Sequence, residues 1–309
     1  MKKFLIVIIS IIVLVIAAAA IVPLIFKDDI KAAISSALDE NLNAEAYFDA
    51  EKFGITLFSS FPNPTVQLSD FGIVGIDQFE GDTLVAVGDF EITVGLFSLF
   101  GDKPTIKSIS LDNALINILV LEDGTANYDI AVASEETVEE DTTASDLEIG
   151  IESWTLTNSR IVYSDKSLPY YLELKNVTHR GKGDFTLDVF DMVTTSKIES
   201  VTTSFDGVTY LSGQHLDADL ILNMDLANMK FTFRENEIKV NDFPLSFDGF
   251  FAMPGDDMEM DIKFASNEAS IKSLYSLIPA AFTEGYENIE AEGTLSFSGF
   301  VKGIYNETA

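Results

Sequence analysis

The feature that most constrains this chain's fold is a strict alternation of side chains over residues 216–226. Leu216, Ala218, Leu220, Leu222, Met224 and Leu226 alternate there with Asp217, Asp219, Ile221, Asn223 and Asp225. Successive side chains of a β-strand point to opposite faces, so this pattern predicts one strand of roughly 36 Å with an apolar and a polar side. Such a strand is about twice the usual length. It requires a long sheet with one apolar face.

Further strands are predicted through most of the chain, because short β-branched and aromatic segments alternate with turn-forming residues. They are Gly54–Phe58, Thr65–Ser69, Thr83–Val87, Phe90–Val94, Ile106–Leu111, Ala114–Leu121, and the alternating stretches around residues 185–189, 231–240 and 258–264. In 231–240, Phe231 and Phe233 are expected to pair with Ile238 and Val240 across a turn. No helix of βαβ length intervenes, so we expect a mainly β fold with an elongated, curled, antiparallel or meandering sheet.

Two short amphipathic helices are predicted beside these strands. In Asp28–Leu42, apolar residues recur at helical spacing, and we expect this helix to cap the first strands, since a helix at a membrane interface usually carries more Lys and Arg. In residues 268–279, Ile271, Leu274, Tyr275 and Ile278 share one helical face before Pro279. This second helix is expected to cover one end or face of the sheet.

The N-terminal stretch Phe4–Phe26 is apolar except for Ser10. At about 1.5 Å per helical residue it spans roughly 34 Å, enough to cross a bilayer core. Lysines precede it and acids follow Lys27, so the positive-inside rule keeps the N-terminus in the cytoplasm and exports the rest. A cleaved signal peptide, with Ala17–Ala20 near the cleavage site, is the alternative, but its apolar core would be shorter.

These signals divide the chain into five parts. They are a cytoplasmic tip (1–3), a transmembrane helix (4–26), a first β segment with its helix (27–133), an acidic linker (134–146) and a second β segment with one helix (147–309). The linker holds six acids and no base, which is typical of a solvated loop.

Composition excludes several function classes. With 19 Lys and Arg against 50 Asp and Glu, the net charge of −31 makes nucleic acid a poor partner. The chain has no cysteine, which excludes thiolate chemistry and Cys-ligated metals. Only His179 and His215 could act as near-neutral acid–base groups; the first is expected in a positive turn, the second on a solvated strand edge. We expect no enzyme, no catalytic residues, no cofactor and no metal.

Two internal echoes suggest that the sheet grew by repetition. IKSISLDNALI (106–116) matches IESWTLTNSRI (151–161) with an offset of 45, and LSFDGF (245–250) matches LSFSGF (295–300) with an offset of 50. Together they favour addition of similar hairpins.

These pieces resemble the AsmA family of inner-membrane-anchored periplasmic proteins, in a form found in Bacteroidetes-like bacteria. The resemblance rests on the N-terminal anchor, on residues 54–73, 79–101, 108–130 and 151–165, and most specifically on EGDTL (80–84) and DGTANYDI (123–130). It implies a lengthwise-folded β-groove related to bridge-like lipid-transfer proteins, and roles in outer-membrane biogenesis, lipid transport and regulation of protein targeting to the membrane. Because the chain ends in what reads as the opening of another hairpin, and relatives are usually longer, we expect a truncated member or an N-terminal portion.

The apolar face must be covered, since exposing it on several long strands would cost about tens of kcal/mol. We expect an open groove in which phospholipid or another acyl lipid replaces water, lined by Leu216, Leu220, Leu222, Met224 and Leu226. The expected location is the inner membrane, with the bulk periplasmic and envelope proteins as possible partners. The alternative is a tethered β-sandwich that serves as a structural or protein-interaction module without lipid.

Overall fold

The computed structural model describes residues 27–57, 60–100, 105–132, 151–255, 257–279, 282 and 292–306. The predicted span Phe4–Phe26 and the acidic linker 134–146 lie outside these ranges. Among the described residues, no helix is long and apolar enough to cross a membrane.

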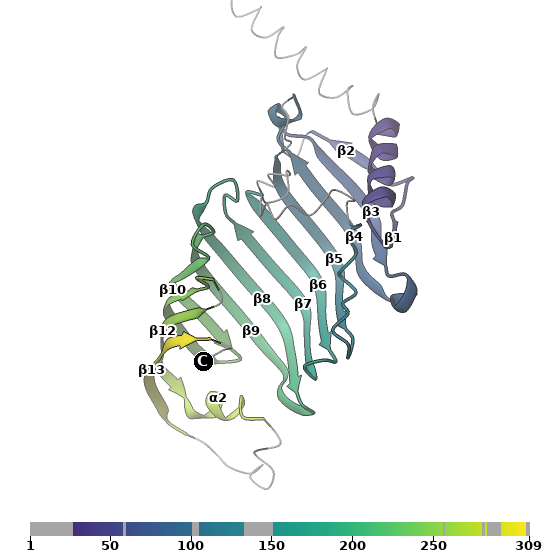
Figure 1. The fold of residues 1–309 in the computed structure, drawn as a ribbon. Helices are drawn as coiled ribbons and strands as arrows, with labels where there is room; N and C mark the ends of the chain where they lie inside the picture. The colour runs from purple at the N-terminus through teal and green to yellow at the C-terminus, as the bar shows by residue number, and fades with distance from the viewer. Residues whose placement is uncertain are drawn as a thin grey trace, which may run out of the picture.

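The described strands form one large sheet of thirteen strands (Figure 1). They are β1 (Glu45–Tyr47), β2 (Gly54–Thr56), β3 (Thr65–Val74), β4 (Thr83–Val94), β5 (Ile106–Val120), β6 (Ser153–Asp165), β7 (Tyr170–Lys182), β8 (Val189–Phe205), β9 (Val208–Asp225), β10 (Lys230–Val240), β11 (Phe243–Ala252), β12 (Met258–Ser270) and β13 (Thr294–Tyr305). Two 3₁₀ turns, η1 (Asp77–Phe79) and η2 (Phe97–Phe100), lie beside β4. The mainly β prediction is confirmed.

Strand order follows the chain almost throughout, as the meander prediction requires. The exception is β5 and β6, which pair in parallel, so the sheet is mixed rather than wholly antiparallel. A parallel pair cannot be joined by a tight hairpin and needs a long connection, which residues 121–152 supply.

Three predicted turns are wrong. Residues 83–87 and 90–94 form the single strand β4, 106–111 and 114–121 form β5 up to Val120, and 231–240 form β10 instead of a hairpin. In β10 the polar residues of the predicted turn instead produce a register shift between Phe233 and Asn236. Such bulges absorb one extra residue without ending the strand.

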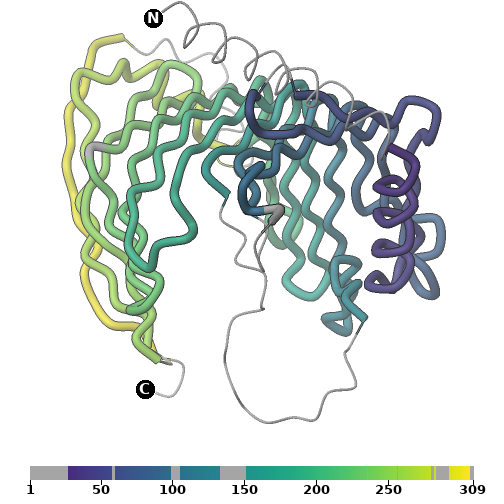
Figure 2. The backbone as a smooth tube through the Cα atoms, turned by 90° about the horizontal axis from the view of Figure 1, so that it is seen from above, coloured from purple at the N-terminus to yellow at the C-terminus, as the bar shows by residue number. Residues whose placement is uncertain are grey.

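Residues with a left-handed backbone conformation are aligned across the first half of the sheet. Asp70 in β3, Asn113 in β5, Asn158 in β6 and Asn176 in β7 have positive φ angles of 51°, 54°, 50° and 50°. Strand pairing brings them to matching levels: Asp112 pairs with both Asp89 and Thr157. The pairing skips these positions, and the register shifts there only between β6 and β7. Figure 2 shows that the sheet is curled, with a concave and a convex face.

Both predicted helices are present and both pack on the sheet. Residues 27–41 are helical, and Ile30, Ile34 and Leu38 pack against the main apolar cluster, which confirms the capping role. The second helix, α2 (Ile271–Tyr275), is shorter than predicted. Its N-cap is Ser270, whose side chain accepts a hydrogen bond from the Ser273 N–H.

Candidate functional site

One face of the sheet carries apolar side chains from strand to strand. Residues paired across neighbouring strands point to the same face, and the pairing aligns apolar side chains in rows. One row comprises Ile73, Val85, Ile116, Ile161, Leu174 and Val201, and another comprises Phe190, Met224, Phe231, Phe251 and Met260. These rows make the apolar face continuous from β3 to β12.

The apolar face is the concave one. The ring of Phe243 in β11 stacks on that of Phe297 in β13, with centroids 6.1 Å apart, although β12 lies between the two strands. The helical residues 27–41 lie on the same face, because they pack on its central cluster. Curvature brings side chains on the inner face of a sheet closer together, so even without a second layer many of them are partly buried.

Four of the five predicted lining residues lie on this face. Leu216, Leu220, Leu222 and Met224 have the same parity in β9 and are partly buried, and Leu216 packs against the central cluster. Leu226 lies beyond the end of β9, in the turn to β10, and is 37% exposed. The strand ends at Asp225, so the alternation read from the sequence runs one residue too far.

The described part of the chain contains no second sheet facing this surface. Its strands form a single sheet, and extensive contacts between strands join sheet neighbours only. The chain therefore does not adopt the β-sandwich of the alternative interpretation over these residues. Near one end α2 approaches β9 and β10, where the side-chain amides of Gln214 and Asn241 donate to Ser276 at 3.4 and 3.3 Å.

A histidine interrupts the apolar face. His179 lies within β7, so its predicted position in a turn is wrong. The indole Nε1–H of Trp154 donates to His179 Nε2 at 2.9 Å, and Nδ1 lies 2.7 Å from the Ser196 hydroxyl. Burial lowers the pKa of His179 below its ordinary value of 6.5, so the ring is neutral at pH 7.

Trp154 covers the backbone of the next strand. A Cβ atom at Gly181 would lie 2.0 Å from the indole ring, so glycine is required there for the ring to lie flat on β7. Trp154 also meets Phe185 edge-on, and Phe185 packs on Phe190 with centroids 4.7 Å apart. This aromatic group lies on the concave face, and the sequence analysis did not single it out as part of a site.

The opposite, convex face is polar along β9 and its neighbours. Asp217 and Asp219 point away from the leucines of β9, and a cavity of about 390 Å³ on that side is lined by these two residues, Glu237 and Lys239 among others. His215 Nε2 lies 3.1 Å from Asp217 Oδ2, and both side chains are exposed. The described residues contain no cluster of His, Cys, Asp or Glu suited to a metal ion.

The two most specific family motifs lie together at one end of the first strands. EGDTL turns at Gly81 into β4, and in DGTANYDI the buried Asn127 bonds the backbone of β5: its Oδ1 accepts from Leu119 N at 2.9 Å and its Nδ2 donates to Asn117 O at 2.8 Å. Phe79, which precedes EGDTL, and Asn127 line a shallow cavity of about 330 Å³. The contacts described for these two motifs are those that stabilise turns.

The sequence model of the AsmA family matches residues 1–223. The chain belongs to the AsmA family. No curated protein and no solved structure matches the chain. The AsmA match extends from the apolar N-terminus almost to the end of β9, so it includes Leu216, Leu220 and Leu222 on the concave face. Membership indicates a function related to the bacterial envelope and outer-membrane biogenesis.

Proposed function

We propose that this AsmA protein binds lipid acyl chains along the concave face of its sheet while anchored in the inner membrane by Phe4–Phe26. The bulk of the chain then lies in the periplasm, where it contributes to outer-membrane biogenesis and affects protein targeting to the membrane. Phospholipid, or another lipid with acyl chains, is the cargo, and envelope proteins are the partners at the far end.

The observation that carries the proposal is a continuous apolar face with no second sheet opposite it in the described residues. Leu220, Leu222 and Met224 remain partly exposed on it. Apolar surface costs about 25 cal/mol per Å² in water, so a ligand that covers the face is favoured. The face is long enough to hold extended acyl chains, since β9 alone has 18 residues and spans roughly 60 Å at about 3.3 Å per residue.

Movement along such a groove needs no covalent chemistry, and the proposed activity is therefore non-enzymatic. A lipid keeps its tails against the concave face and its headgroup in water. Apolar contacts discriminate weakly between chains that differ by one methylene, so the expected selectivity among acyl lipids is modest.

The test is mass spectrometry of lipids that remain with the full chain after extraction in a mild detergent and gel filtration. A matched pair of variants, Leu222→Asp on the concave face and Asn223→Asp on the convex face, separates the groove from the rest of the surface. We expect bound phospholipid in the native chain and Asn223→Asp, and much less in Leu222→Asp. A folded, lipid-free native chain would contradict lipid binding and favour a scaffold that binds proteins.

A further inference from the structure

Large apolar side chains are exposed at one end of the sheet, on loops that are far apart in the sequence. They are Phe61 (58% exposed), Phe97 (79%), Leu187 (50%), Val189 (52%), Leu226 (37%) and Met229 (43%). We call this set the apolar rim. Phe61 precedes β3, Phe97 follows β4, Leu187 and Val189 lie where β7 turns into β8, and Leu226 and Met229 lie between β9 and β10.

Hydrogen bonds place these loops side by side. The Leu96 N–H donates to Asn63 Oδ1 at 3.1 Å, which ties the Phe61 loop to the Phe97 turn. Further along, the Leu226 N–H donates to Asp188 O at 2.8 Å and joins the β7–β8 turn to the β9–β10 turn. The rim therefore follows one row of strand ends, which we call one edge of the curled sheet, across these strands.

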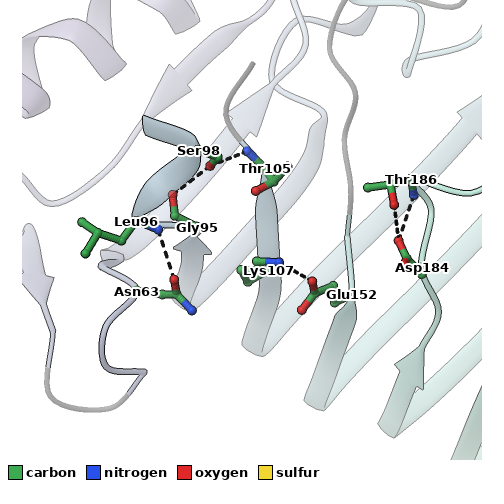
Figure 3. A network of polar contacts seen from close by, with 9 residues as sticks. All are labelled: Asn63, Gly95, Leu96, Ser98, Thr105, Lys107, Glu152, Asp184 and Thr186. Carbon is green, nitrogen blue, oxygen red and sulfur yellow. Dashed lines mark hydrogen bonds and ion pairs between the residues drawn. The ribbon is translucent and has the colours of Figure 1, made fainter. Parts of the chain in front are cut away.

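Polar contacts hold the loops in shape, as Figure 3 shows. Ser98 Oγ donates to Gly95 O and accepts from Thr105 N, both at 2.8 Å. Lys107 is paired with Glu152, just before the neighbouring strand β6. Because their backbones are fixed in this way, the loops keep the apolar side chains exposed at defined positions.

The predicted anchor joins the sheet from this side. Lys27 Nζ lies 5.9 Å from the centroid of the Phe53 ring, just before β2, whereas the other end of the helix is tied to the opposite edge by Asn43 N–H to Ile130 O at 2.7 Å. The helical residues 27–41 thus run from the rim side to the far side (Figure 1). An apolar span that ends at Phe26 brings the rim next to the bilayer surface.

We propose that the apolar rim inserts into the outer surface of the bilayer that Phe4–Phe26 spans. This inference rests on the proposed function, because it uses the same anchor and gives the concave face direct access to acyl chains. Apolar and aromatic side chains at the headgroup boundary are favoured there, and insertion reaches about 5–10 Å. Acids among them, such as Asp184 and Asp188, stay at headgroup level.

An exposed apolar patch can mark a contact with either a protein or a membrane. We choose a lipid surface because the predicted anchor supplies a bilayer at this edge. Apolar side chains are also exposed at the opposite edge, where Leu168 is 60% and Phe205 49% exposed. The 13 residues of β6 separate the two edges by roughly 43 Å at about 3.3 Å per residue. That edge provides a matched control with the same chemistry and no anchor.

The absence of cysteine from the sequence permits single-cysteine labelling of the full chain. Phe97→Cys and Leu187→Cys at the rim, and Leu168→Cys and Phe205→Cys at the far edge, are labelled with an environment-sensitive fluorophore. Each is reconstituted in nanodiscs of phosphatidylethanolamine and phosphatidylglycerol, with or without lipid that carries a nitroxide on its acyl chain. We expect the nitroxide to quench the two rim labels strongly and to leave the two far-edge labels unchanged.

Absent quenching at the rim, or equal quenching at both edges, would contradict insertion of the apolar rim into the bilayer. The result is separable from lipid carriage. Quenched rim labels on a chain that retains no lipid would remove the proposed cargo and leave membrane docking intact. Lipid retained by a chain whose rim labels are not quenched would contradict rim insertion alone and leave the proposed lipid binding intact.

Discussion

The backbone N–H of Ala114 donates to Ser159 Oγ at 3.0 Å, across two strands whose residues are 45 positions apart in the sequence. The same offset pairs Ser108 with Ser153, Leu111 with Leu156 and so on along β5 and β6. It is also the offset of the internal echo between 106–116 and 151–161. The repeated segments therefore lie side by side, parallel and in register, and the positive-φ residues Asn113 and Asn158 occupy equivalent positions in them.

A first prediction concerns the bulge at Asn158. Its φ of 50° is costly for most residues, and its side-chain Nδ2 donates to Asp112 Oδ1 at 2.9 Å. We expect Asn158→Ala to lower the free energy of unfolding by about 1–2 kcal/mol. Asn158→Gly, which tolerates positive φ, should cost less than Asn158→Ala, and urea unfolding measures both. Equal losses in the two variants would contradict a backbone origin.

The second prediction concerns Asn127 in the DGTANYDI motif. This side chain is 2% exposed and bonds two backbone groups of β5. We expect Asn127→Ala to lower the free energy of unfolding by about 1–3 kcal/mol, because two buried backbone groups lose their partners. Lipid retention by the folded variant should stay unchanged. A loss of retained lipid without a loss of stability would instead assign the motif to binding.

The third prediction concerns pH. Burial lowers the pKa of His179 in the folded chain, so the unfolded chain binds a proton more readily. The contribution of neutral His179 to the free energy of unfolding is fully present above pH 6.5. It is lost as the pH falls from there toward the lower pKa of the folded chain. We expect the unfolding free energy to decrease as the pH is lowered from 7 through the unfolded-state pKa of 6.5.

His179→Gln is the control for this pH dependence, since glutamine keeps a polar group without titrating. The variant should have a flatter stability profile over that pH interval, measured by urea unfolding at a series of pH values. A profile with the native slope would assign the effect to other groups.

The sequence predicts the class of fold because alternation and turn residues are local signals. The strand β9, the helical residues 27–41 and the long apolar face all follow from periodicity. The parallel pair β5–β6 does not, although the echo at offset 45 was visible, because an echo alone does not say whether its copies lie side by side. Asp112–Asn113 resembles a turn in sequence, but β5 continues through it because it pairs with β4 on one side and with β6 on the other.

The candidate site is predictable only in part for a similar reason. Leu216, Leu220, Leu222 and Met224 share a face because strand parity places them there. His179 lies on the same face as these leucines, but its neighbours Arg180, Gly181 and Lys182 suggest a turn. The role of Gly181 depends on the ring of Trp154 from another strand, a contact that no local pattern encodes.

Photo-crosslinking along β9 tests the central claim most directly. A benzophenone amino acid is placed in turn at Leu220 and Leu222 on the concave face, and at Asp219 and Asn223 on the convex face, in the full chain within native membranes. The account predicts lipid adducts at Leu220 and Leu222 and none at the two control positions, so that labelling alternates with strand parity. Equal labelling on both faces, or no lipid adduct at any position, would contradict a lipid-binding concave face.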